Sequence, residues 1–173
     1  SKGLIVARPG FRPLVAKPGY DAAIDAVGSI VTQLLGQQGG VRNLFELRIR
    51  MEVSLVRDAA GSARSHDIAR LESALQKNKD AIDDSEKLFH GILHDIPGNP
   101  VLPAIHRAYT DWLSAHWKKM PRLPDRNRAN YEAHKSIFDA ILRRNPDQAE
   151  AEMRKHLDMA WDQVCATFEN LKQ

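Results

Sequence analysis

Residues 146–168 read Pro-Asp-Gln-Ala-Glu-Ala-Glu-Met-Arg-Lys-His-Leu-Asp-Met-Ala-Trp-Asp-Gln-Val-Cys-Ala-Thr-Phe, and this stretch decides the fold class. Apolar side chains return every three or four residues along it, which is the period of an amphipathic α-helix. The face predicted to be buried consists of Ala149, Met153, Leu157, Ala160, Trp161, Val164 and Phe168. His156 falls on that face, so the pattern predicts a long helix that turns a histidine toward the core.

The same period continues backward along the chain as far as Asp21. Glycine, proline and asparagine separate the periodic segments, and we expect Asn145 to adopt the left-handed conformation that ends a helix. Helices are predicted at about residues 21–36, 43–61, 65–82, 84–96, 100–119, 126–144 and 146–171. The sequence therefore predicts an all-α bundle of six to seven helices.

The first 19 residues follow a different pattern. Two short apolar runs, residues 4–7 and 14–16, flank the segment Arg8-Pro9-Gly10-Phe11-Arg12-Pro13. Proline presets the backbone angle and glycine supplies unusual angles, so this segment is typical of a hairpin tip. We expect a short N-terminal β-hairpin fragment.

Composition narrows the class of protein. The 173 residues are 43% hydrophobic and 27% charged, which excludes a disordered or collagen-like chain. No apolar run approaches the roughly 20 residues that a bilayer span requires, so no membrane partner is expected. The one cysteine, Cys165, fits the last helix's apolar flank and a reducing cytoplasm. A net charge of +3 does not by itself indicate a nucleic-acid surface.

Two more of the predicted helices carry histidines on or beside an apolar face. His134 lies three residues from both Tyr131 and Ile137, and His90 follows Glu86 by one helical turn. A single histidine on an apolar face is usually a core residue that bonds backbone or side-chain groups. A Glu-x3-His pair is more often a surface contact than a metal site.

Taken together, these side chains indicate a metal centre. Three inward histidines and a carboxylate are costly to bury separately, whereas one divalent transition metal satisfies them together. Neutral imidazole and carboxylate suit zinc, nickel, manganese or iron(II). His94 lies one turn after His90, so the pair His90-x3-His94 would chelate an ion as well as Glu86-x3-His90 does. The fourth ligand stays open between Glu86 and His94.

At these residues the sequence resembles the FCD effector domain of FadR-type regulators in the GntR family of bacterial transcription factors. The resemblance covers about residues 21–170, and the last two histidines, 22 residues apart, agree with the family's spacing. The matching segments are Leu44-Phe45-Glu46-Leu47-Arg48, Glu86-Lys87-Leu88-Phe89-His90, Gly98-Asn99-Pro100-Val101-Leu102, His134 ahead of Ile137 and Ile141, and Met153-Arg154-Lys155-His156-Leu157.

The resemblance implies a homodimeric helical domain with a divalent metal held by one acid and three histidines. The ligands carried over are Glu86, His90, His134 and His156. The family usually has aspartate at the position of Glu86. A small organic acid is the implied effector, and Arg48 is the candidate partner for its carboxylate because guanidinium matches carboxylate geometry. The alternative for Arg48 is a surface or inter-helix salt bridge.

The N-terminal segment resembles the wing of a winged-helix DNA-binding domain. Residues 1–19 are then a wing remnant, residues 20–40 a linker helix, and residues 41–173 the effector-binding and dimerisation domain. The helices that read DNA in such a domain are largely absent from this chain. Arg8, Arg12 and Lys2 are candidates for phosphate contacts, with solvated loop charges as the alternative.

The leading hypothesis is a ligand-sensing domain of a bacterial transcriptional regulator, not an enzyme. A small helical metallohydrolase with the same ligands is one alternative. The chain offers no nucleophile motif and no obvious second acid–base group for it. A metal-free helical module for ligand binding or dimerisation is the other alternative.

Overall fold

The computed structural model describes residues 5–6, 10, 12, 14–15, 19–77, 82–117 and 126–167. Over these residues the chain is all-α, as the sequence predicted, with seven helices and one pair of two-residue strands. The strands are β1 (Ile5–Val6) and β2 (Leu14–Val15). The helices are α1 (Tyr20–Leu35), α2 (Gly40–Ser62), α3 (Ser65–Lys77), α4 (Ile82–Asp95), α5 (Val101–Trp117), α6 (Arg126–Leu142) and α7 (Pro146–Thr167).

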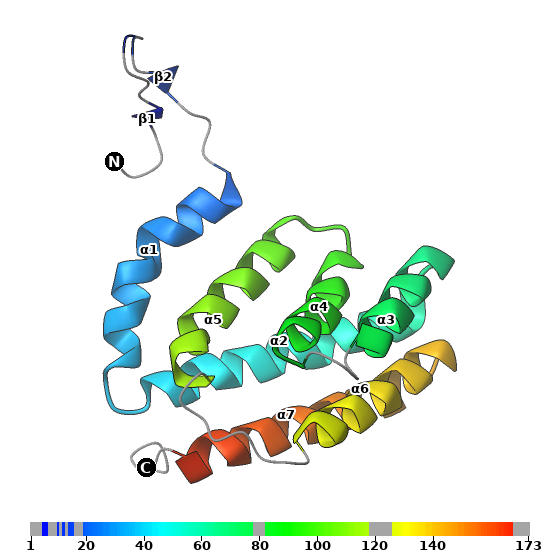
Figure 1. Cartoon of the computed structure of the whole chain (residues 1–173). Helices are drawn as coiled ribbons and strands as arrows, with labels where there is room; N and C mark the ends of the chain where they lie inside the picture. Colours follow the sequence, from blue (N-terminus) through cyan, green and yellow to red (C-terminus); the bar gives the residue numbers. More distant parts are fainter. Residues whose placement is uncertain are drawn as a thin grey trace.

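Helix α2 is the central element of the bundle (Figure 1). The antiparallel neighbours α6 and α7 pack along one side of it, and α4 and α5 pack along the other. Helix α3 rests against α4 and α6, while α1 lies at the edge of the bundle against α5. Four helices, α2, α4, α6 and α7, therefore enclose the centre of the molecule.

The face that α2 turns inward explains its central place. Phe45, Val56 and Ala59 are at most 1% exposed and recur at helical spacing along this face. Arg48 and Glu52 occupy positions of the same stripe, at 3% and 0% exposure. Two opposite charges are thus carried into the core by a helix whose neighbouring inward positions are apolar.

Two predicted helix boundaries differ from the observed ones. Helix α2 begins at Gly40 rather than Asn43, because Gly39 turns the chain with a left-handed φ of 76° and its carbonyl accepts from the Asn43 amide. The left-handed residue before α7 is Arg144, with φ 56°, and not Asn145. The Asn145 side chain instead accepts a hydrogen bond from the Gln148 amide at 3.1 Å, so it caps the start of α7.

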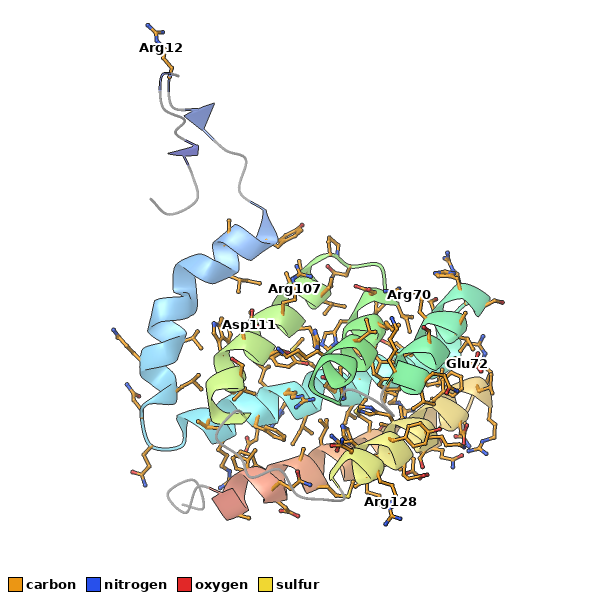
Figure 2. The ribbon with its side chains drawn as sticks, viewed as in Figure 1. Arg12, Arg70, Glu72, Arg107, Asp111 and Arg128 are labelled. Atoms are coloured by element: carbon orange, nitrogen blue, oxygen red, sulfur yellow. The ribbon has the colours of Figure 1, made fainter. Side chains whose placement is uncertain are left out.

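The two short strands pair antiparallel, with Ile5 opposite Val15 and Val6 opposite Leu14. Between them Arg12 is exposed, and Figure 2 shows it at the end of the segment remote from the bundle. Lys2 and Arg8 lie outside the described residues. None of the helices in the described ranges is long and apolar enough to cross a membrane.

Candidate metal centre

Three helices each supply one buried imidazole to the centre of the bundle. His90 comes from α4, His134 from α6 and His156 from α7, and all three are at most 2% exposed. The Nε2 atom of His90 lies 3.2 Å from Nε2 of His134 and 3.2 Å from Nε2 of His156. Three nitrogen atoms that can each carry a lone pair therefore converge on one point.

Packing fixes the orientation of these rings. Phe89, the residue before His90 on α4, stacks on the His134 ring with centroids 4.5 Å apart and planes 13° apart. The His90 and His156 rings lie nearly parallel, 5.3 Å apart. Ile137 and Met153, both fully buried, belong to the core cluster, and each lies three residues from a histidine on its own helix.

Glu52 of α2 determines which nitrogen of His90 faces the other imidazoles. Its Oε2 atom lies 2.9 Å from Nδ1 of His90, and its Oε1 atom accepts a hydrogen bond from the Tyr109 hydroxyl, with the two oxygen atoms 2.5 Å apart. A carboxylate only accepts hydrogen bonds, so Nδ1 of His90 carries a proton. Nε2 of a neutral His90 is then free of a proton and available as a ligand. Carboxylate–histidine pairs orient metal ligands in this way.

Arg48 completes the charge arrangement one turn before Glu52. Its Nε atom lies 3.5 Å from Oε1 of Glu52, and its guanidinium stands over the rings of Phe45 and Tyr109, 5.7 and 5.9 Å from their centroids. Both members of this ion pair are buried. The interior of the bundle therefore holds a positive and a negative side chain side by side.

Burial and these neighbours set the protonation states. Burial alone would raise the pKa of Glu52, but His90, with its hydrogen bond, and Arg48 hold that pKa well below its usual range. Burial lowers the pKa of His134 well below 6.5, and the neighbouring His156 and His90 add to the effect. Burial likewise lowers the pKa of His156. At neutral pH Glu52 is an anion, and His134 and His156 are neutral.

Glu52 also belongs to a second group of potential ligands. Glu52, His94 and His106 each offer one atom, and these atoms lie within 4.8 Å of one another. Nδ1 of His94 donates to the His90 carbonyl at 3.0 Å, and burial lowers the pKa of His94. Burial also lowers the pKa of His106 to about 3. Both imidazoles are neutral at pH 7.

The structure brings together three of the residues singled out in the sequence, His90, His134 and His156. The helical backbone places Glu86 one turn before His90, and its side chain lies outside the described residues. His94 is not the fourth member of this trio, because its imidazole belongs to the group with His106. Arg48 is buried and pairs with Glu52 on its own helix, so it does not lie at the surface.

Two residues of the site, Glu52 and His106, were missed from the sequence. Glu52 could have been found from the sequence, because it lies between Phe45 and Val56 on a stripe whose only other polar member is Arg48. His106 lies three residues before Tyr109 and four after Leu102, on the apolar face of its helix. The reasoning that selected the other histidines, a titratable side chain at a buried position, applies equally to both.

A pocket of about 440 Å³ opens beside this second group, between α4 and α5 with a contribution from α3. Gly91 and His106 form part of its wall, and a Cβ atom added at Gly91 would lie 3.5 Å from the His106 ring, which is ordinary contact distance. Arg70 of α3 and Asp95 of α4 form an ion pair at its rim. Figure 2 shows Arg70 and Arg107 approaching this region from α3 and α5. The pocket leads from the surface to His106.

Comparison with known proteins identifies the domain. The FCD domain family matches residues 43–159, which include α2 through most of α7 and all the residues of both groups. The chain belongs to the FCD family. FCD domains are parts of transcriptional regulators, which agrees with the prediction of a regulator rather than an enzyme.

Relatives place this FCD domain among the GntR-type regulators. The HTH-type transcriptional repressor NanR of Cronobacter sakazakii is 36% identical over 180 residues, covering 99% of this chain and 68% of that protein. NanR of Salmonella typhimurium is 38% identical over 168 residues, covering 91% of this chain and 63% of that protein. The chain thus spans about two thirds of the length of these relatives.

Solved structures confirm the fold of the FCD domain. A GntR protein of Streptococcus agalactiae superposes with a TM-score of 0.61 at 19% identity, over 92% of this chain and 74% of that one. The metal-free FCD domain of the protein TM0439 superposes with a TM-score of 0.59 at 19% identity, over 76% of this chain and 93% of that one.

Proposed function

We propose that this FCD domain senses a small organic acid through a divalent transition metal held by His90, His134 and His156. The observation that carries the proposal is the 3.2 Å separation of Nε2 of His90 from Nε2 of each of the other two rings. Imidazoles that share a zinc-like ion bind it at about 2.0–2.1 Å, so their nitrogen atoms lie roughly 3–3.4 Å apart. The residues present therefore fit such an ion.

Hydrogen bonds within the described part of the protein do not satisfy every nitrogen atom of the three rings. Nδ1 of His90 donates to Glu52, so its Nε2 offers one lone pair to two neighbouring rings. The Nδ1 atom of His156 has no hydrogen-bond partner among the described residues. Burying the Nε2 atoms without full partners costs free energy, which a cation shared by these three atoms would compensate. Zinc, nickel, manganese and iron(II) all accept this donor set, and Glu86 is the candidate fourth ligand.

The charge of the interior favours an anionic ligand. A bound divalent ion and Arg48 would together bring three positive charges, against one negative charge from Glu52 and one from Glu86 as the fourth ligand. A carboxylate entering the site would offset this excess. The metal would act as a Lewis acid that attracts the carboxylate. Arg48, held over Phe45 and Tyr109, would orient it by pairing with its oxygen atoms.

The remaining parts of the chain fit a regulator of transcription in the cytoplasm. Residues 1–19 would be the end of a winged-helix domain, whose wing offers Lys2, Arg8 and Arg12 to DNA phosphates. Residues 20–40 would link it to the effector-binding and dimerisation domain, residues 41–173. In a homodimer, a ligand that binds one packing of the helices better than another would shift the DNA-binding units.

Metal content measured on the protein purified without added metal tests this function. The wild type should carry about one transition-metal ion per chain, detected by elemental analysis. His134→Ala and His156→Ala should each reduce this content severalfold, because each removes one of three ligands. His66→Ala is the matched control, since His66 is an exposed histidine on α3, and it should retain the ion.

Ligand binding completes the test. Thermal-shift screening against organic acids should reveal stabilisation by at least one of them, and removal of the metal with a chelator should abolish it. A wild type that carries no metal, or metal content unchanged in both alanine variants, would overturn the metal centre and favour a metal-free module. Turnover of ester, amide or phosphate substrates by the metal-loaded protein would favour the hydrolase.

A further inference from the structure

The group formed by Glu52, His94 and His106 has a hydrogen-bonding requirement that the described protein does not meet. Nδ1 of His94 donates to the His90 carbonyl, so Nε2 of the neutral imidazole carries a lone pair. His94 is 0% exposed, and its Nε2 atom has no hydrogen-bond partner among the described residues. A buried acceptor of this kind needs a proton donor or a cation beside it.

His106 contacts the ring of His94 and also lines a pocket that opens to the surface. It is 6% exposed, and its ring centroid lies 4.6 Å from that of His94. His106 and Gly91 also form part of the wall of the 440 Å³ pocket. A volume of this size lies within the range of small-molecule sites. A ligand that enters the pocket therefore meets His106, whose ring lies against that of the buried His94.

A second metal ion and a hydroxyl group are the two kinds of partner to compare. A cation here would share Glu52 with Arg48, whose Nε lies 3.5 Å away, and would lie near the ion proposed for the three other histidines. Charge repulsion in a poorly solvated interior opposes that arrangement. A hydroxyl adds no charge. It can donate to Nε2 of His94 and accept from the single N–H of His106.

The spacing of the group also suits an oxygen atom. One oxygen about 2.8 Å from each of three atoms can serve atoms that are up to 4.8 Å apart. The same limit of 4.8 Å describes the group of His90, His134 and His156, so distance alone does not separate an oxygen atom from a cation. Charge favours the hydroxyl group.

We propose that His94 and His106 form a hydroxyl-recognition subsite, so that the domain distinguishes hydroxylated organic acids from their deoxy counterparts. The inference rests on the proposed function, which places the acid group at His90, His134 and His156. His90 and His94 are one turn apart on α4, about 5–6 Å between their Cβ atoms. One small molecule can therefore reach both places, with its carboxylate and hydroxyl separated by two or more carbon atoms.

Isothermal titration calorimetry on the metal-containing protein tests the subsite with butyrate, 3-hydroxybutyrate and 4-hydroxybutyrate, and with hexanoate and gluconate. These pairs place hydroxyls beyond the carbon next to the carboxylate, where direct chelation of the metal contributes least. At least one hydroxylated acid should bind the wild type about tenfold or more tightly than its deoxy partner, because the deoxy acid leaves Nε2 of His94 unpaired.

His94→Phe should reduce this ratio to within about twofold while the metal content stays at the wild-type level. His106→Phe, at the pocket wall, should do the same and serves as the second variant if His94→Phe does not fold. His66→Phe, an exposed histidine of α3, should keep the wild-type ratio.

Three results would overturn the subsite. Equal affinities of the wild type for both members of every pair would do so, as would a ratio that survives both phenylalanine variants. A second metal equivalent, present in the wild type and lost in His106→Phe, would replace it with a cation site. Failure of the proposed function looks different, because in that case His134→Ala would not alter metal content or no acid would bind in a chelator-sensitive way.

Discussion

Glu52 occupies a position on α2 where helical spacing favours an apolar side chain. Each of its two carboxylate oxygen atoms accepts a hydrogen bond from a different residue. Oε2 accepts from His90 and so directs Nε2 of that imidazole toward His134 and His156. Oε1 accepts from Tyr109 and faces Arg48. One carboxylate therefore connects the candidate metal centre, the candidate acid partner and the hydroxyl subsite.

Glu52→Gln tests the effect of the Glu52 carboxylate on His90. The amide oxygen can still accept from His90, but it carries no negative charge, so Nε2 of His90 becomes a weaker metal ligand. We expect metal affinity, measured by competition with a chelator of known affinity, to fall roughly 10- to 100-fold. Glu46→Gln is the matched control, because Glu46 is an exposed partner of Arg42 on the same helix, and it should leave the affinity unchanged. Equal affinities for the two variants would show that Glu52 does not act on the metal.

At the scale of helices, α5 has contacts on two sides that belong to different parts of the proposed mechanism. Its His106 and Tyr109 side chains reach the site, while Trp112 faces α1. A Cβ atom added at Gly28 of α1 would lie 3.6 Å from Nε1 of Trp112, which is ordinary contact distance. Helix α1 therefore rests on the same helix that lines the ligand pocket, which suits a linker that responds to the ligand.

Gly28→Leu should loosen this contact. Alanine fits at the observed distance, but the larger side chain overlaps Trp112, and overpacking of this kind costs about 1–3 kcal/mol. We expect amide hydrogen exchange within residues 20–35 to speed up by roughly tenfold or more, with little change in α6 and α7. Gly28→Ala should not show this acceleration.

Gly61 of α2 provides the control for the glycine position. No atom lies within 4 Å of a Cβ added there, so Gly61→Leu should leave exchange in α1 at the wild-type level. Unchanged exchange in Gly28→Leu would mean that α1 does not depend on this contact with α5.

The sequence predicted the helices better than it predicted the neighbours of each histidine. Apolar period and stop signals are local, and they place His90, His134 and His156 on buried faces correctly. The contact of Glu52 with His90 depends on how α2 crosses α4, and residues 38 positions apart give no periodic signal for that crossing. Arg144 shows the same limit on a small scale, because a left-handed turn was expected one residue later.

At the scale of the whole molecule, the buried imidazoles make the stability of the fold depend on pH. Burial lowers the pKa of His94, His134 and His156, and it lowers that of His106 to about 3. In the unfolded chain these groups titrate near 6.5. As the pH falls below about 6.5, the unfolded chain takes up protons that the folded chain does not. Acid therefore favours unfolding, and the stability recovers as the pH rises again.

His106 permits a quantitative form of this prediction. Between pH 7 and pH 5 its lowered pKa should account for a loss of about 2 kcal/mol in the free energy of unfolding. His106→Phe removes this contribution, so its free energy of unfolding should depend less steeply on pH than that of the wild type. Urea unfolding of metal-depleted protein at pH 7, 6 and 5 measures both dependences without competition between protons and metal. His66→Phe should follow the wild type, and a His106→Phe curve parallel to both would show that His106 is protonated as readily in the folded chain as in the unfolded one.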